Sequence, residues 1–519
     1  MSTPERPTQP PGIEGASEPA AGRLRGSVIS GAMWKAASQI TLQLLQLITI
    51  IVLSRLLGPV TFGLVGMVTV FASLLSYFTD MAFSAALVQR KELTHDHCVT
   101  AFWMNTGAGL ALALTGVAIA PLVADFFNQP RVEPLFQVMS LNLFVAGLGR
   151  VQYALLMRDM RFRSLELRSI IAGVAGAAVG VGMAFAGFGA WALIGQITTI
   201  NCLRTALVWV ASEWRPTFAF SWAAWKDIRR FSRDVLATNI LYFLNSNADN
   251  LIVGKFLGPG PLGIYRLSYN MMLQPIYRFV VPIRNVVFPA FSKMQTDRER
   301  MLAAWIRVNR IVLGFVLPAV VGLVVTAPDF VDVVFGHRWH GAVPVIMALA
   351  AVGVLQSLQR LNDSVMQARN RTGQQLVFAG IALAANLTAF LVGVQFGVAG
   401  VAVGAAIACG VVQPAYTVAT AHALGTTVRV AMQGVAGVVA ACTVMGAGSL
   451  GIRLGMTAVG VPIVPRFACE VAAGVAIFAA AVLHFEPDLV QDCRMMLSDV
   501  RRRIRRRGGA GVEPALSSK

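Results

Sequence analysis

Basic and hydrogen-bonding side chains recur at helical spacing within one apolar stretch near the middle of the chain. At about 100° per residue, Arg266, Tyr277 and Arg284 fall within roughly 20° of one another, and Asn270 lies about 40° away. Arg278 lies about a third of a turn aside, but two nearby prolines could turn it inward. Since charged side chains within membrane helices usually face an interior, this stripe predicts a cationic cavity that could bind anionic groups. Alternatively, Arg278 and Arg284 only extend to lipid headgroups.

A second polar face occurs in residues 341–366. Gln356, Arg360, Asp363 and Gln367 follow one another at spacings of four, three and four, which places them on one side of a helix. Arg360 and Asp363 could form an ion pair, and the sequence leaves open whether such a pair would be structural or functional.

Two stripes of amides are expected on other helices. Such amides can hydrogen-bond a ligand, but they also join helices to each other, and both interpretations stay open. The amides are Gln39, Gln43 and Gln46 in residues 29–55, and Asn239 and Asn250 in residues 232–256.

The elements that carry these residues are long and apolar. Of 519 residues, 56% are hydrophobic and only 13% are charged, whereas a soluble chain carries about a quarter charged residues. Several runs of about 20 residues, among them 106–124 and 430–452, contain no Asp, Glu, Lys or Arg. Only helices and closed barrels satisfy the backbone in lipid, and these continuous runs do not alternate as barrel strands do. The sequence therefore predicts an all-α polytopic membrane protein.

About fourteen transmembrane helices are predicted. They are residues 29–55, 60–88, 98–124, 134–157, 167–187, 189–211, 232–256, 262–290, 305–328, 341–366, 375–395, 397–420, 428–452 and 466–485. Basic residues then concentrate in alternate connections, which predicts that both termini are cytoplasmic. This distribution accounts for the formal charge of +18 without nucleic acid as a partner. The arginine-rich run 501–507 is interpreted as a topology anchor on anionic lipids.

The chain repeats itself at an offset of 200 residues. The segment 55–59, followed by Gly63, reappears as 255–259, followed by Gly263. Six predicted helices separate equivalent points, so the two halves should insert in the same direction as parallel pseudo-symmetric six-helix lobes. The predicted parts are a disordered tail (1–25), an N-lobe (26–211), an interfacial linker helix (212–231), a C-lobe (232–421), two further helices (428–485) and a basic tail (486–519).

Several motifs resemble one known family. They are Leu53-Ser54-Arg55-Leu56-Leu57-Gly58-Pro59 with Phe62-Gly63, Ala86-Leu87-Val88-Gln89-Arg90-Lys91, Phe220-Ser221-Trp222, Asp249-Asn250-Leu251-Ile252-Val253-Gly254-Lys255-Phe256-Leu257-Gly258, Phe288-Pro289-Ala290-Phe291-Ser292, and Gly336 with Trp339 ahead of Ala342-Val343-Pro344. Across residues 25–425 the chain thereby resembles the polysaccharide or oligosaccharide flippases (Wzx-like transporters) of the multidrug/oligosaccharidyl-lipid/polysaccharide exporter superfamily. No such motif occurs in the last two predicted helices.

The resemblance implies translocation of an undecaprenyl-pyrophosphate-linked repeat unit, for exopolysaccharide, O-antigen or capsule, from the cytoplasmic to the periplasmic leaflet of the bacterial inner membrane. It also implies alternating access, a cationic cavity for the pyrophosphate and glycan, and a polysaccharide polymerase and co-polymerase as partners. Asp80, Asp249 and Asp363 are candidates for coupling to protons or sodium. Coupling is not obligatory, since each outward-moving negative charge gains roughly 2.3 kcal/mol per 100 mV of inside-negative potential.

Other interpretations remain. A peptidoglycan-precursor flippase and a small-molecule efflux pump of the same superfamily would share the lobes. An enzyme such as a membrane glycosyltransferase is not expected, because the predicted external segments are too short for a catalytic subdomain. The six cysteines are scattered singly, so neither disulfides, a metal site nor another cofactor is indicated. His337 and His340 are interpreted as surface residues rather than a metal pair.

Overall fold

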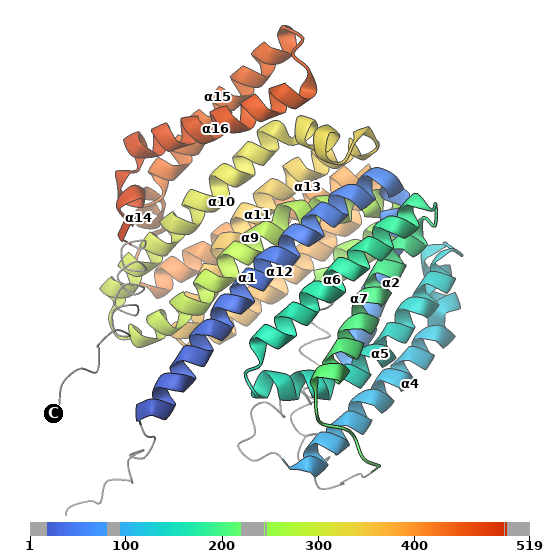
Figure 1. Cartoon of the computed structure of the whole chain (residues 1–519). Coiled ribbons are helices and arrows are strands. Elements are labelled where there is room, and N and C mark those ends of the chain that lie inside the picture. Colours follow the sequence, from blue (N-terminus) through green and yellow to red (C-terminus); the bar gives the residue numbers. More distant parts are fainter. Residues whose placement is uncertain (1–17, 80–93, 219–242, 244–245, 493, 496–519) are drawn as a thin grey trace, which may run out of the picture. The chain divides into compact units, whose positions relative to one another are not determined.

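The computed structural model describes residues 18–79, 94–218, 243, 246–492 and 494–495, and its regular elements in these ranges are all helices (Figure 1). The chain divides into two compact units, each described here by itself. The first comprises residues 1–57 and 68–244, and the second comprises 58–67 and 245–519. The helix α2 (Pro59–Thr79) therefore begins in the second unit and ends in the first.

The first unit is a bundle in which α1 packs on α6, α6 and α5 pack on α7, and α4 packs on α5. Its helices are α1 (Glu18–Leu57), α4 (His95–Phe127), α5 (Val132–Arg158), α6 (Phe162–Phe185) and α7 (Ala190–Ala211). Two glycines bring α4 and α5 close together. A Cβ on Gly109 would lie 2.8 Å from the carbonyl oxygen of Leu143, and one on Gly147 would lie 2.7 Å from that of Asn105. Small residues thus allow the two backbones to touch.

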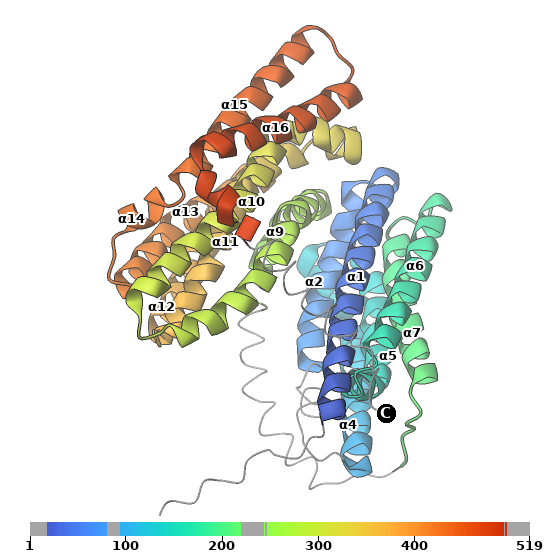
Figure 2. The same ribbon diagram turned by 60° about the vertical axis from the view of Figure 1, so that its left-hand side comes forward.

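The second unit is built around α11, which packs on α9, α10 and α13, while α15 and α16 pack on each other and on α10 (Figure 2). Its elements are α9 (Pro259–Lys293), α10 (Arg298–Val334), η1 (His337–Trp339), α11 (Ala342–Ala368), α12 (Thr372–Gly393), η2 (Val394–Phe396), α13 (Gly397–Ala423), α14 (Val428–Gln433), α15 (Ala436–Ala458) and α16 (Ile463–Phe485). Residues 246–257 are also helical.

The repeated Gly-Pro motif starts a helix at both of its occurrences. Gly58 and Gly258 have φ values of 66° and 85°, a left-handed conformation that glycine adopts without steric cost. Pro59 and Pro259 then occupy the first positions of α2 and α9, where the missing backbone N–H has no helical partner to lose. Both copies of the motif therefore end one helix at glycine and begin the next at proline.

The two copies of this motif also touch within the second unit. A Cβ on Gly63 would lie 1.6 Å from the carbonyl oxygen of Pro259, and one on Gly263 would lie 1.9 Å from that of Pro59. Both distances are far below van der Waals contact, so only glycine fits at either position. The backbones of α2 and α9 cross there without intervening side chains.

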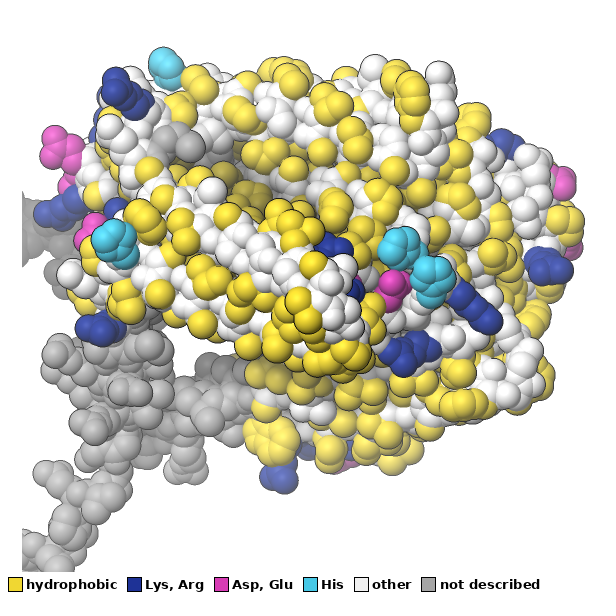
Figure 3. Space-filling model, turned by 90° about the horizontal axis from the view of Figure 1, so that it is seen from above, with side chains coloured by type: hydrophobic (Ala, Val, Ile, Leu, Met, Phe, Trp, Pro, Cys, Tyr) yellow, Lys and Arg dark blue, Asp and Glu magenta, His cyan; other side chains and the backbone are white. Residues whose placement is uncertain are grey.

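The chain is a multi-pass membrane protein. Eleven stretches of the described residues are long and apolar enough to cross a membrane, and one of them, Thr372–Ala423, comprises α12, η2 and α13. Large apolar side chains remain exposed on the helices, including Leu114 (58%), Phe185 (72%) and Val475 (67%). In Figure 3 most of the visible surface is apolar or uncharged. The all-helical prediction is confirmed, whereas the total of fourteen spans stays a prediction.

Two predicted spans differ in detail from the observed helices. The helix α9 is not among the eleven apolar stretches; its sequence includes Arg266, Arg278 and Arg284 together with uncharged polar residues such as Asn270. The single helix predicted over 428–452 was wrong, since the chain breaks between α14 and α15. At this break the carbonyl oxygen of Gly434 accepts a hydrogen bond (3.0 Å) from Nε of Arg310 on α10.

Ion pairs attach α16 and the residues that follow it to α10. Near one end, Nε and Nη2 of Arg466 on α16 each lie 2.6 Å from a carboxylate oxygen of Asp329 on α10. Glu470, one turn further along α16, is buried; its Oε1 lies 3.9 Å from Nε of Arg466, but neither carboxylate oxygen accepts a hydrogen bond. Near the other end, Arg310 pairs with Glu486 (3.3 Å) and Asp488 (3.2 Å).

Candidate functional site

A network of polar side chains lies inside the second unit, where α9, α11, α12 and α13 meet. The guanidinium carbon of Arg360 lies 4.3 Å from the centre of the Tyr277 ring, a cation–π contact between α11 and α9. The hydroxyl of Tyr277 donates a hydrogen bond to Oε1 of Gln356. Nε of Arg360 is buried and has no hydrogen-bond partner. This unsatisfied donor leaves Arg360 with capacity to bind an anionic group.

The carboxylate of Asp363 lies in the same network. It accepts hydrogen bonds from the Tyr416 hydroxyl (2.9 Å) and from Nε2 of Gln375 (3.1 Å). Arg284 and Arg360 also interact with it electrostatically. Within the described residues no ion pair joins Arg360 directly to Asp363, because Tyr416 on α13 and Gln375 on α12 hold the carboxylate. We call Tyr277, Arg284, Gln356, Arg360 and Asp363 the α9–α11 cluster.

Arg266 lies elsewhere on α9. Its Nη1 donates a hydrogen bond (2.7 Å) to the carbonyl oxygen of Gly66 on α2. The nearby carboxylate of Asp249 is buried and accepts a hydrogen bond from the Tyr265 hydroxyl (3.0 Å). It also accepts two hydrogen bonds from Asn250, one from the backbone N–H (2.7 Å) and one from the side-chain Nδ2 (3.0 Å). Oδ1 of Asn250 is buried without a partner. Arg266 and Asp249 interact electrostatically, so this group is close to charge-balanced.

The remaining predicted residues of α9 differ in exposure. Asn270 is half-buried, and Arg278 is exposed. Of the acids and amides predicted from sequence, Asp80 and Asn239 lie outside the described residues, as does most of the predicted linker helix. Their place in the structure stays a prediction.

The first unit contains a separate polar cavity of about 620 Å³ between α1, α5, α6 and α7. Three basic side chains and one acidic side chain line it, so its wall carries an excess of positive charge. The charged and hydrogen-bonding lining residues are Lys35, Gln39, Arg150, Tyr153, Glu166, Ser169, Asn201, Arg204 and Thr205. The hydroxyl of Ser38 on α1 donates a hydrogen bond to Glu166 on α6 and thereby fixes this acid.

Only one of the three glutamines predicted as a stripe on α1 lines this cavity. Gln39 contributes to the wall, whereas Gln43 is half-buried and Gln46 is exposed, and neither belongs to the lining. The spacings of four and three residues do place Gln39, Gln43 and Gln46 on one face of α1, as predicted. The α1 residues that line the cavity are Lys35, Gln39 and Leu42, so the cavity extends along only part of this helix.

Sequence reasoning missed several polar residues of the second unit. Nε2 of Gln413 donates to Oε1 of Gln359 (2.8 Å), and Nε1 of Trp305 donates to Oδ1 of Asn362 (3.1 Å). Tyr416 and Gln375 were also missed. Gln413 and Tyr416 are three residues apart in an otherwise apolar helix, a spacing that would have placed them on one face.

Comparison with known proteins supports the resemblance seen in the motifs. Residues 52–344 match the family described as polysaccharide biosynthesis protein. The chain is 30% identical over 385 residues to the lipopolysaccharide biosynthesis protein WzxC of Escherichia coli (strain K12), covering 73% of this chain and 78% of that protein. It is 29% identical over 308 residues to the succinoglycan biosynthesis transport protein ExoT of Rhizobium meliloti (strain 1021), covering 59% and 62%.

A solved structure of the lipid II flippase MurJ, in an inward closed conformation, has a similar fold. The TM-score is 0.69 at 15% sequence identity, and the match covers 89% of this chain and all of that chain. At this identity the likeness concerns the fold alone. The sequence relatives and the family match together confirm the resemblance that the motifs predicted, and the chain belongs to the polysaccharide biosynthesis protein family of membrane transporters.

Proposed function

We propose that the protein is a flippase that moves undecaprenyl-pyrophosphate-linked oligosaccharide repeat units from the cytoplasmic to the periplasmic leaflet of the bacterial inner membrane. Both termini would then lie in the cytoplasm. Membership of the family supports this function, as does the name of a relative that is a transport protein of succinoglycan biosynthesis. The observation that carries the proposal is the presence of arginines inside membrane helices of a family member, where a charge is costly unless it serves a purpose.

Two cationic regions would contact the phosphorylated lipid. Arginine forms two parallel hydrogen bonds with phosphate, and a pyrophosphate offers several acceptor oxygens. In the second unit, Arg360 and Arg284 would bind these oxygens, with Tyr277 holding the Arg360 guanidinium in place. In the first unit, Arg150, Arg204 and Lys35 of the polar cavity would present a second positive wall.

Amide and hydroxyl groups would contact the glycan. Gln39, Asn201 and Ser169 line the cavity of the first unit. Each can donate or accept hydrogen bonds to sugar hydroxyls without carrying a charge. In the second unit, Gln356 accepts a hydrogen bond from Tyr277, and Gln375 donates one to Asp363 and accepts one from Gln367. These two glutamines would therefore serve mainly to orient Tyr277 and Asp363.

The proposed movement follows alternating access and is driven by the membrane potential. A pyrophosphate carries about two negative charges, and each gains roughly 2.3 kcal/mol per 100 mV on moving outward. Asp249 and Asp363 are satisfied by hydrogen bonds from neighbouring side chains. In this scheme neither carboxylate has to gain or lose a proton, and no ion gradient is required.

The function can be tested with purified protein in liposomes that contain a fluorescent polyprenyl-pyrophosphate oligosaccharide. An enzyme that cleaves the glycan, added outside, reports how much of the lipid becomes accessible. We expect accessible lipid to rise beyond the half reached in protein-free liposomes. A peptidoglycan-precursor flippase would move lipid II instead, and an efflux pump would move small cations but not the labelled lipid. Either result would overturn the proposal.

A further inference from the structure

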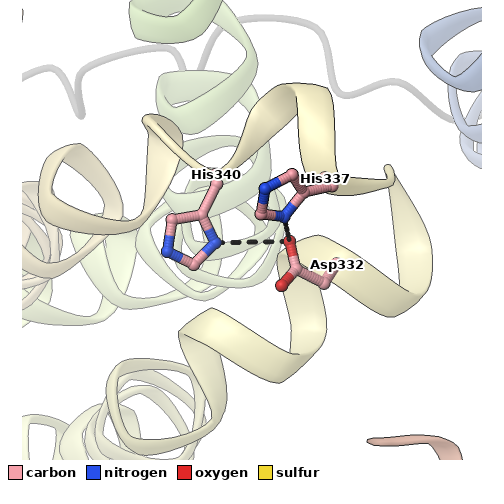
Figure 4. Close-up of side chains that lie close together, drawn as sticks. All are labelled: Asp332, His337 and His340. Carbon is pink, nitrogen blue, oxygen red and sulfur yellow. Dashed lines mark hydrogen bonds and ion pairs between the residues drawn. The ribbon is translucent and has the colours of Figure 1, made fainter.

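Three side chains with metal-ligating atoms converge where α10 is joined to α11 (Figure 4). Asp332 lies in the last turn of α10, His337 is the first residue of the short helix η1, and His340 directly follows η1. Nδ1 of His340 lies 3.3 Å, and Nδ1 of His337 lies 3.7 Å, from Oδ1 of Asp332. Arg360 follows the start of α11 by eighteen residues, about 27 Å along the helix, so this group is separate from the α9–α11 cluster.

The backbone of this connection is held rigidly by two buried aromatic residues. Phe335 and Trp339 are 1% and 0% exposed, and the Trp339 ring packs edge-to-face on Phe62 with a centroid distance of 5.3 Å. The N–H of Gly336 bonds to the carbonyl of Val331, and Gly336 has a φ of 92°, which allows the sharp turn after α10. Because Phe335 and Trp339 point inward, the histidines between and beside them point outward.

The spacing of the three ligand atoms suits a small transition-metal ion. Zinc binds histidine nitrogen and carboxylate oxygen at about 2.0–2.1 Å in a tetrahedron, which places neighbouring ligands roughly 3.4 Å apart. Both histidine-to-aspartate separations are close to this value, and all three ligand atoms lie within 4.8 Å of one another. Only the two imidazoles need to approach each other.

We propose that Asp332, His337 and His340 form a binding site for a divalent ion of the zinc class, with the remaining coordination position open to water. Two imidazoles and one carboxylate favour zinc, nickel or copper over magnesium and calcium, which prefer oxygen ligands throughout. The side chains of His337 and His340 are 89% and 52% exposed, so the ion has direct access. The bound ion would tie the end of α10 to η1.

Arg338 lies between the two histidines in the sequence, and its positive charge could repel a metal cation. Its Cδ lies 4.0 Å from the position of a Cβ on Gly58, so its side chain extends along the start of α2. These three residues were not grouped from the sequence, because Asp332 belongs to a different helix from the histidines. His337 and His340 are surface residues as predicted, but they share a carboxylate.

The test is calorimetric titration of zinc chloride into the full-length, metal-free protein from which any affinity tag has been removed. We expect saturable binding of one equivalent, which His337→Ala combined with His340→Ala abolishes and Asp332→Asn weakens. His484→Ala removes an exposed histidine elsewhere and serves as the matched control, with unchanged binding. Magnesium chloride should give no saturable heat.

Two results would overturn the site. One is the absence of saturable zinc binding by the unchanged protein, and the other is equal binding by the double histidine variant. Because all three side chains lie at the surface end of the connection, the variants should fold, which gel filtration and circular dichroism can verify. If a variant does not fold, the visible absorption spectrum of cobalt added to the unchanged protein decides the question. Cobalt in a tetrahedral site with histidine ligands produces strong visible bands, whereas free cobalt does not, so the absence of such bands would also overturn the site. The readout is independent of lipid transport.

Discussion

At the scale of single residues, the α9–α11 cluster depends on how Arg360 is held. Its guanidinium stacks on Tyr277, and its buried Nε has no partner. Lysine would keep the charge but could neither stack as a planar group nor present two parallel donors. The geometry at this position therefore matters as well as the charge.

We expect Arg360→Ala and Arg284→Ala each to reduce transport by more than about tenfold, since one charge-assisted hydrogen bond contributes about 1.5–3 kcal/mol. Arg266→Ala should also reduce transport, but because it removes the hydrogen bond to Gly66 and the cation beside the buried carboxylate of Asp249. Arg360→Lys should retain part of the activity. The measurement is restoration of polysaccharide export in a strain that lacks its flippase, with protein amounts compared by immunoblot.

Arg300→Ala is the control for these variants, because the Arg300 side chain is 80% exposed and pairs only with Asp297 on its own helix among the described residues. It should restore export fully. Full restoration by the alanine variants of Arg284 and Arg360 would remove the basis for a cationic binding surface.

At the scale of helices, the crossing of α2 and α9 has the strictest packing requirement. Gly63→Ala or Gly263→Ala would place a methyl group well inside contact distance of a backbone carbonyl, which cannot rotate away. We expect either change to lower the free energy of unfolding by at least about 1–3 kcal/mol, the usual cost of overpacking. Thermal unfolding in detergent would measure it.

Gly380→Ala provides the comparison for the crossing glycines. Gly380 lies within α12, and a Cβ there would meet nothing within 4 Å. Alanine favours a helix by up to about 1 kcal/mol over glycine, so this variant should be as stable as the unchanged protein or more stable. Equal stability of the Gly63 and Gly380 variants would contradict the close crossing.

The attachment of α16 to α10 leads to a second prediction about helices. Arg466→Leu would leave Asp329 and Glu470 buried with one cation fewer, and breaking such a buried pair costs about 3–5 kcal/mol. Glu470→Gln should have the opposite effect, because it removes a buried charge whose oxygens accept no hydrogen bond. We expect thermal unfolding to show a lower midpoint for Arg466→Leu and an unchanged or higher midpoint for Glu470→Gln.

Helical elements were largely predictable, whereas contacts between them were not. Long apolar runs located α4, α5 and α11, and the breaks at Gly58 and Gly258 were visible as a repeated motif. Periodicity placed Arg266 and Arg284 on one face, but eighteen residues separate them by about 27 Å along the helix axis, so they contact different partners. No pattern within α9 could indicate that Gly66 or Asp363 would be those partners.

At the scale of the whole molecule, the proposed driving force for transport is the membrane potential. We expect flux of the labelled lipid in liposomes held at a fixed potential, with no proton or sodium gradient. The side from which the lipid moves must be the negative one. Two charges and 100 mV correspond to roughly 4.6 kcal/mol, enough for more than a thousandfold accumulation. The rate should respond to the size of the potential.

An absence of flux under these conditions, together with flux after a proton or sodium gradient is added, would refute drive by the field. Asp249→Asn and Asp363→Asn would then identify the coupling site, because asparagine retains the ability to accept hydrogen bonds from Tyr265 or Tyr416 but cannot exchange a proton. The unchanged protein without a potential is the reference for both measurements.

The paired glycines at the crossing of α2 and α9 have an evolutionary consequence. Gly63 and Gly263 occupy equivalent places in the sequence repeat, and a side chain on either would collide with the proline carbonyl of the other copy. Neither codon can therefore drift away from glycine, whatever the other encodes. A library randomised at both positions and selected for folded protein should return glycine at both.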